Sequence, residues 1–158
     1  MDKLETYLSD HLSGSIVAID LARRRASSQG DDEIGTALRG FATEVERDQR
    51  TLRNVIASLD ASPSMIKELM ASGTAWVDSI RNALNLPGAP NLVRDLELLI
   101  MGVRGKELLW KALEEIGVET DPPIRDLQDR VTAQLLRLDM LHDRAVEKEF
   151  GRTDTRRT

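Results

Sequence analysis

The sequence contains no cysteine. Disulfide bonds, zinc–thiolate sites, iron–sulfur clusters and thiol nucleophiles are therefore excluded, because all of them require cysteine sulfur. Aromatic residues make up only 3% of the chain, so stacking platforms for single-stranded nucleic acid are not expected. The net charge of −5 agrees with this, since nucleic-acid-binding domains usually present a basic face. We expect no nucleic-acid partner.

Long hydrophobic runs are also missing. No stretch of about 18 apolar residues occurs, and the first residues, MDKLETYLSD, lack the apolar region of a signal peptide. We therefore expect no membrane association and a cytoplasmic location. With 41% hydrophobic residues, the 158-residue chain is long enough for one domain with a core, predicted over 1–150. Residues 151–158, GRTDTRRT, have no apolar anchor and are predicted to form a flexible tail.

The stretch from Asn91 to Gly117 is predicted to form a central, buried helix. Asn91 is a suitable N-terminal cap, and Gly117 is a residue that commonly ends a helix. Apolar residues recur at helical spacing on two of its sides, one side formed by Leu92, Leu96, Leu99, Val103, Trp110 and Leu113 and the other by Leu98, Leu109, Ala112 and Ile116. Such a helix is normally packed on both sides. Gly102 and Gly105 are interpreted as places where a neighbouring backbone comes close.

Three further helices are predicted, over about 2–28, 31–59 and 122–150, the last with Pro122 in its first turn. Apolar residues in the second helix alternate steps of four and three, along the seam Ile34, Leu38, Phe41, Val45, Asp48, Leu52, Val55 and Leu59. The connection 60–90 is too long for a hairpin turn. It is predicted to be a helical crossover that places helices 31–59 and 91–117 parallel.

This order of helices, with two short loops and one long crossover, resembles the ferritin-like four-helix bundle. The fold class is therefore predicted to be all-α, a ferritin-like bundle with a crossover between its second and third helices. The resemblance implies a Glu-x-x-His motif on the second and fourth helices. Asp139-x-x-His142 comes nearest, whereas the second helix offers only Glu46-x-x-Gln49. The stretches YLSDHLSGS, EVERDQ and GVRGKELLWKAL also resemble an uncharacterised bacterial group of helical bundle proteins without a complete metal site.

A layer of polar residues emerges when the four helices are set side by side in this topology. Five of them fall within about 5 Å of one height: His11, Asp48, Lys106, Glu107 and Gln134. Three interpretations are open. The first is a hydrogen-bonded cluster with an Asp48–Lys106 ion pair. The second is a site for a single divalent metal, bound by His11, Asp48 and Glu107. The third is a small-ligand pocket that the layer lines. Lys106 counts against the metal, because it would place a positive charge beside the cation.

The sequence favours a non-catalytic helical bundle that acts through self-association, as a homodimer, or through another protein. No catalytic residue, metal or other cofactor is assigned on this hypothesis. The alternative is a degenerate ferritin-like protein that binds a metal, or acts in redox chemistry, at a site in the bundle core.

Overall fold

The structure is a computed structural model that describes residues 3–59 and 91–151. Four helices make up these ranges: α1 (Lys3–Gln29), α2 (Glu33–Ser58), α4 (Leu92–Glu115) and α5 (Ile124–Phe150). No strand occurs in the described part of the chain. The prediction of an all-α four-helix bundle is thus confirmed at this level. The predicted crossover at 60–90 and the predicted tail beyond residue 151 lie outside the described residues.

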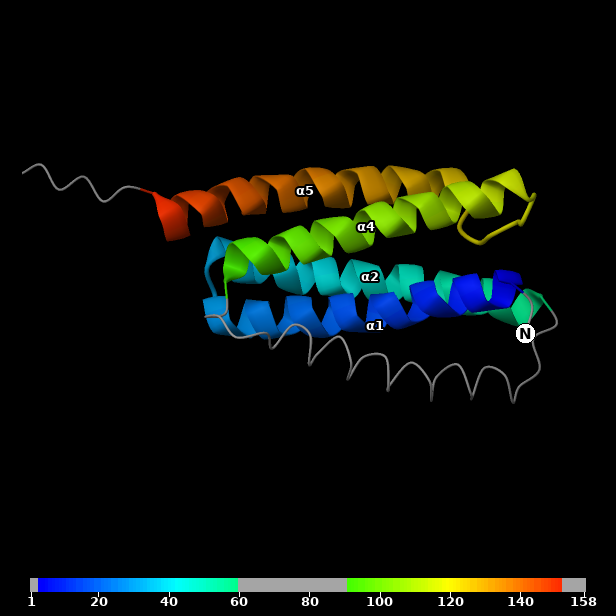
Figure 1. Ribbon diagram of the computed structural model, residues 1–158, viewed down its shortest axis with the longest axis horizontal. Helices are drawn as coiled ribbons and strands as arrows, with labels where there is room; N and C mark the ends of the chain where they lie inside the picture. Colours follow the sequence, from blue (N-terminus) through cyan, green and yellow to red (C-terminus); the bar gives the residue numbers. More distant parts are fainter. Residues whose placement is uncertain (1–2, 60–90, 152–158) are drawn as a thin grey trace, which may run out of the picture.

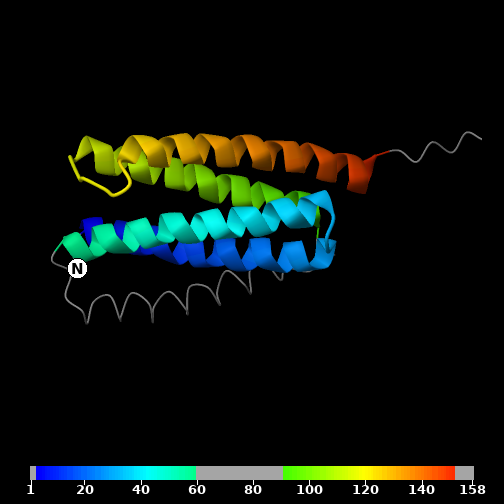
Figure 2. The ribbon, with the colours of Figure 1, turned by 180° about the vertical axis from the view of Figure 1, so that it is seen from behind.

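The helices pair as two antiparallel hairpins that lie one upon the other (Figures 1 and 2). Helix α1 packs against α2 and α4, and α5 packs against α4 and, more sparsely, against α2. Following the colours of Figure 1, α2 and α4 run in the same direction, as the length of the 60–90 connection predicts. This parallel course brings the middle of α2 and the middle of α4 to the same height.

The helix ends follow the expected capping chemistry, with one exception. Asp32 caps α2 by accepting a hydrogen bond from the Gly35 backbone N–H at 2.7 Å, and the Asn91 side chain accepts from the backbone of Val93 at 2.8 Å. Gly117 has φ of +73°, the left-handed conformation that suits glycine after a helix. The prediction that Pro122 lies in the first turn of the last helix is wrong, because α5 begins only at Ile124. A residue that precedes proline, as Pro122 does, is sterically disfavoured in the helical conformation.

The core is built along the predicted seams. All predicted seam positions of α2 are buried except Leu59, which is half-buried, and Asp48 is buried among them. The second predicted apolar side of α4 is packed only in part: Leu109 is buried, but Ile116, directly after the helix, is more than half exposed. Met101 and Leu108, which belong to neither predicted side, are more than half exposed as well. These three residues lie away from the face that carries the fully buried Trp110.

Helices α1 and α4 are joined by a buried ion pair that the sequence did not indicate. The Arg25 guanidinium donates to the Asp95 carboxylate, and only 5% of the Asp95 side chain is exposed. Arg25 belongs to a run of arginines at the negative end of the α1 dipole. Its neighbour Arg23 pairs with Glu46 on α2, but that pair lies at the surface. The end of α1 is therefore tied to the start of α4 inside the bundle.

We predict that Asp95→Ala destabilises the protein far more than Glu46→Ala does. Removing the Asp95 carboxylate leaves the Arg25 charge largely buried, which should lower the free energy of unfolding by about 2 to 4 kcal/mol. Glu46→Ala breaks a surface pair and should cost about 0.5 kcal/mol or less. Urea denaturation of both variants measures the difference. Equal losses would show that the Arg25–Asp95 pair contributes no more than a surface contact.

Candidate functional site

The carboxylate of Asp48 is held by three side chains in the middle of the bundle. Its Oδ2 accepts a hydrogen bond from Lys106 Nζ at 2.6 Å and from Gln134 Nε2 at 3.2 Å. Its Oδ1 accepts from Arg130 Nη1 at 2.7 Å. Only 3% of the Asp48 side chain is exposed. The predicted contact between Asp48 and Lys106 is present, and Gln134 of α5 is hydrogen-bonded to both residues.

This cluster continues outward through Glu44. Gln134 donates to Glu44 at 3.2 Å, and the Arg137 guanidinium donates to both Glu44 oxygens, at 2.7 and 2.5 Å. Lys106 also donates to Gln134 Oε1 at 2.5 Å. We call the following six residues the polar network: Glu44, Asp48, Lys106, Arg130, Gln134 and Arg137. The network joins α2, α4 and α5 and contains two carboxylates and three cationic groups.

Two predicted members of the layer lie elsewhere. The assignment of Glu107 is wrong: its carboxylate accepts from Arg104 on the same helix, and 42% of its side chain is exposed. One residue step turns the side-chain direction by about 100° around a helix, so Lys106 and Glu107 do not share a face. His11 lies on α1, outside the polar network, and lines a neighbouring cavity. The three ligands of the hypothetical metal site, His11, Asp48 and Glu107, are therefore not brought together.

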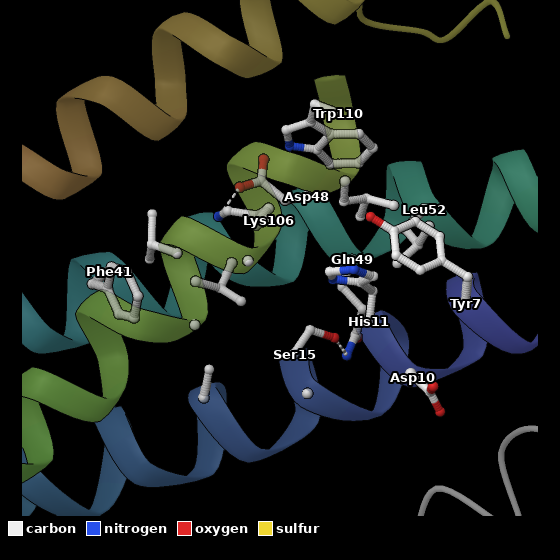
Figure 3. A pocket seen from close by; sticks show the side chains of 17 residues that line it. Tyr7, Asp10, His11, Ser15, Phe41, Asp48, Gln49, Leu52, Lys106 and Trp110 are labelled. Carbon is white, nitrogen blue, oxygen red and sulfur yellow. Dashed lines mark hydrogen bonds and ion pairs between the residues drawn. The ribbon is translucent and has the colours of Figure 1, made fainter. Parts of the chain in front are cut away.

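A cavity of about 400 Å³ lies between α1, α2 and α4 (Figure 3). On α2 its lining runs from Phe41 to Leu52, a length of about 16 Å at the helical rise per residue. Most of the wall is apolar. Its polar residues come from three helices: Tyr7, Asp10, His11 and Ser15 from α1, Asp48 and Gln49 from α2, and Lys106 from α4. The cavity thus shares one wall with the polar network.

Three glycines, one on α1 and two on α4, form part of the cavity lining. They are Gly14, Gly102 and Gly105. Among the described residues, a Cβ atom placed on Gly102 would meet nothing within 4 Å, and one on Gly105 would meet only His11 Cε1, at 3.8 Å. The interpretation that a neighbouring backbone approaches closely at Gly102 and Gly105 is therefore wrong. These two glycines leave space, because a larger side chain at Gly105 would project towards His11.

The polar atoms of the cavity wall differ in whether they have partners. Gln49 donates to the Ser15 hydroxyl at 2.8 Å, which in turn donates to the Leu12 carbonyl at 2.6 Å. Trp110 is only 1% exposed, yet among the described residues its Nε1 finds no acceptor. The edge of the Tyr7 ring meets the His11 ring, with 4.6 Å between the centroids.

Burial lowers the pKa of two basic side chains that line the cavity, His11 and Lys106. It lowers the pKa of the His11 imidazole, and the nearby Asp10 carboxylate offsets this only in part. It also lowers the pKa of the Lys106 ammonium, against the opposing attraction of Asp48.

No protein family, curated protein or solved structure was found to match this chain. Within residues 3–59 and 91–151, no three histidine or carboxylate side chains are grouped so as to hold a metal ion. His142, the nearest match to a ferritin-like ligand, instead contacts Glu97 at 3.2 Å. None of the described helices is both long and apolar enough to cross a membrane.

We predict an asymmetry between the two ends of the central ion pair. Asp48→Ala leaves Lys106 and Arg130 without their carboxylate and should lower the free energy of unfolding by about 3 to 5 kcal/mol. Lys106→Met should lower the free energy of unfolding by less, because Arg130 and Gln134 still donate hydrogen bonds to the Asp48 carboxylate. Because the two residues interact directly, the double variant should be less destabilised than the sum of the single ones. Additive effects in a urea-denaturation cycle would contradict the contact.

A second prediction concerns the pH dependence of stability. The pKa of His11 in the folded protein lies below its ordinary value of 6.5, so the unfolded chain binds more protons between these two pKa values. The contribution of His11 is therefore fully present above about pH 6.5 and is lost as the pH falls to the folded-state pKa. His11→Gln should flatten the fall in unfolding free energy between neutral and mildly acidic pH. An unchanged slope in urea titrations would contradict a buried, neutral imidazole.

Proposed function

We propose that this protein is a non-catalytic helical bundle that binds a small, mainly apolar molecule in the cavity between α1, α2 and α4. The observation that carries this proposal is a mainly apolar cavity of about 400 Å³ that residues of three helices line. Ligand sites in proteins are typically mainly apolar spaces of about 300 to 1,000 Å³ with a few polar groups.

The arrangement of Ser15 and His11 supports binding over catalysis. A serine nucleophile needs its proton directed towards a base. The Ser15 hydroxyl instead donates to the Leu12 carbonyl and accepts from Gln49. Its proton is therefore not directed towards His11, although both residues line the cavity.

We predict that a single substitution blocks the cavity and leaves the protein folded. N-phenyl-1-naphthylamine, a neutral dye whose fluorescence rises in apolar surroundings, should bind the wild-type protein with one saturable site. Gly105→Leu should weaken this binding at least about tenfold, because the new side chain enters the cavity beside His11. Leucine also favours a helix over glycine, by about 0.8 kcal/mol, so the variant should stay folded.

Gly40→Leu is the matched control. Gly40 lies within α2 and does not line the cavity, and a Cβ atom placed on it would meet nothing within 4 Å in the part of the chain that the structure describes. This variant gains the same helix propensity and should bind the dye as the wild type does. Absence of dye binding in the wild type, or equal binding by Gly105→Leu, would overturn the proposal.

Self-association is the second candidate function. It is favoured by Leu136 and Met140, which lie four residues apart on α5 and are 63% and 59% exposed. Sedimentation of the wild type and of a Leu136→Ser, Met140→Ser variant tests it: a dimer that the double substitution dissociates would support a homodimer. A wild-type monomer at high concentration would remove this candidate. The relation to ferritin-like bundles stays a prediction from helix order.

A further inference from the structure

The charged side chains of the cavity lining offer no unpaired charge to a ligand inside the cavity. They are Asp10, Asp48 and Lys106. Asp48 and Lys106 form an ion pair with each other, at 2.6 Å, and the second Asp48 oxygen accepts from Arg130. Asp10 is exposed to bulk water, and its carboxylate points away from the ring of His11 (Figure 3). An ionic group that entered the cavity would therefore lose hydration without gaining an opposite charge.

The imidazole of His11 has no hydrogen-bond partner among the described residues. The side chain is half-buried and lines the cavity, and its ring contacts the ring of Tyr7. Other polar atoms of the lining are already paired: both Asp48 oxygens accept hydrogen bonds, and the Ser15 oxygen accepts from Gln49. The two nitrogens of His11 are therefore available to a group that enters the cavity.

The edge of the His11 ring that carries both nitrogens faces an open space beside α4. Its Cε1 atom, which lies between the two nitrogens, is 3.8 Å from the position that a Cβ atom would take on Gly105. Gly102, three residues earlier on α4, also lines the cavity and has no side chain to fill it. Figure 3 shows the His11 side chain rising from α1 into the midst of the lining residues. A ligand group in the space beside Gly105 would thus meet the nitrogen-bearing edge of the imidazole.

The charge state of His11 determines what such a group must offer. Burial lowers the pKa of the imidazole below its ordinary value of 6.5, so the ring is neutral at neutral pH. A neutral imidazole has one unprotonated nitrogen, which accepts a hydrogen bond, and one N–H, which donates. A hydroxyl group can donate to that nitrogen and carries no charge.

We propose that the cavity takes an uncharged, mainly apolar molecule whose hydroxyl group donates a hydrogen bond to the His11 imidazole in the space beside Gly105. The apolar body of this ligand lies along the apolar lining, which extends from Phe41 to Leu52 on α2. This inference rests on the proposed function, because it names the ligand class of the same cavity.

Three ligands that share an ethylphenyl group test the charge of the ligand on the unaltered protein at neutral pH. 4-Ethylphenol, which is uncharged, should displace the bound N-phenyl-1-naphthylamine at a concentration at least about tenfold lower than 4-ethylbenzoate or 4-ethylbenzylammonium does, because only the ions lose the hydration of a charge. Either ion competing as well as 4-ethylphenol would overturn the inference while leaving the proposed function intact. Failure of the dye to bind at all would overturn the proposed function itself.

His11→Phe tests the hydrogen bond, because phenylalanine keeps a flat ring and removes both nitrogens. 4-Ethyltoluene is the matched ligand, since it differs from 4-ethylphenol only by a methyl group in place of the hydroxyl. In the variant the affinity for 4-ethylphenol should fall about fivefold, whereas the affinity for 4-ethyltoluene should stay within about twofold. An equal loss for both ligands, or no loss for 4-ethylphenol, would contradict the role of His11. The comparison of the three ligands on the wild type tests the inference whether or not this variant folds.

Discussion

The buried carboxylate of Asp48 is the constraint on which the arrangement of three helices depends. A bare charge in an apolar seam is very costly, so α2 is stable in this position only where α4 and α5 present donors at the same height. Lys106, Gln134 and Arg130 meet that need. A shift of either partner helix by one turn would break these contacts. The polar network therefore sets the register of α2, α4 and α5, while the surrounding apolar residues provide the bulk of the stabilisation.

Helix α1 contributes no residue to the polar network and is held by other contacts. The cavity lies between α1 and the helices α2 and α4. Near its C-terminal end α1 is tied to α4 by the buried pair of Arg25 and Asp95. Towards the middle, Gly102 and Gly105 leave a space that a closer-packed bundle would fill. Lys106, which donates hydrogen bonds to Asp48 and Gln134, is also one of the residues that line this space. The same residue thus belongs to the polar network and to the cavity wall.

Much of the fold could be predicted from the sequence, because helix periodicity and loop length are local properties. The seam of α2, the cap at Asn91 and the parallel course of α2 and α4 all follow from them. Asp48, Lys106 and Gln134 could be placed together because their heights follow from topology and helical rise.

The remainder of the site depends on side-chain reach and packing, which periodicity does not report. Arg130 and Arg137 lie on the flanks of α5 and reach the network through long side chains. The sequence did contain one indication of these residues: Glu44 lies four residues before Asp48, and Arg130 lies four residues before Gln134, so that each pair shares a helix face. The two glycines were misread because glycine permits a close approach and an open space equally well.

The central claim is that the cavity between α1, α2 and α4 binds a small, mainly apolar molecule. The most direct measurement is the proton–nitrogen correlation NMR spectrum of the protein during titration with N-phenyl-1-naphthylamine, with the backbone signals of the lining glycines Gly14, Gly102 and Gly105 assigned by substitution. The account predicts that these signals shift and saturate together with binding, whereas the signal of Gly40, which does not line the cavity, stays in place. Saturable binding of the dye with unmoved signals of the three lining glycines would contradict it.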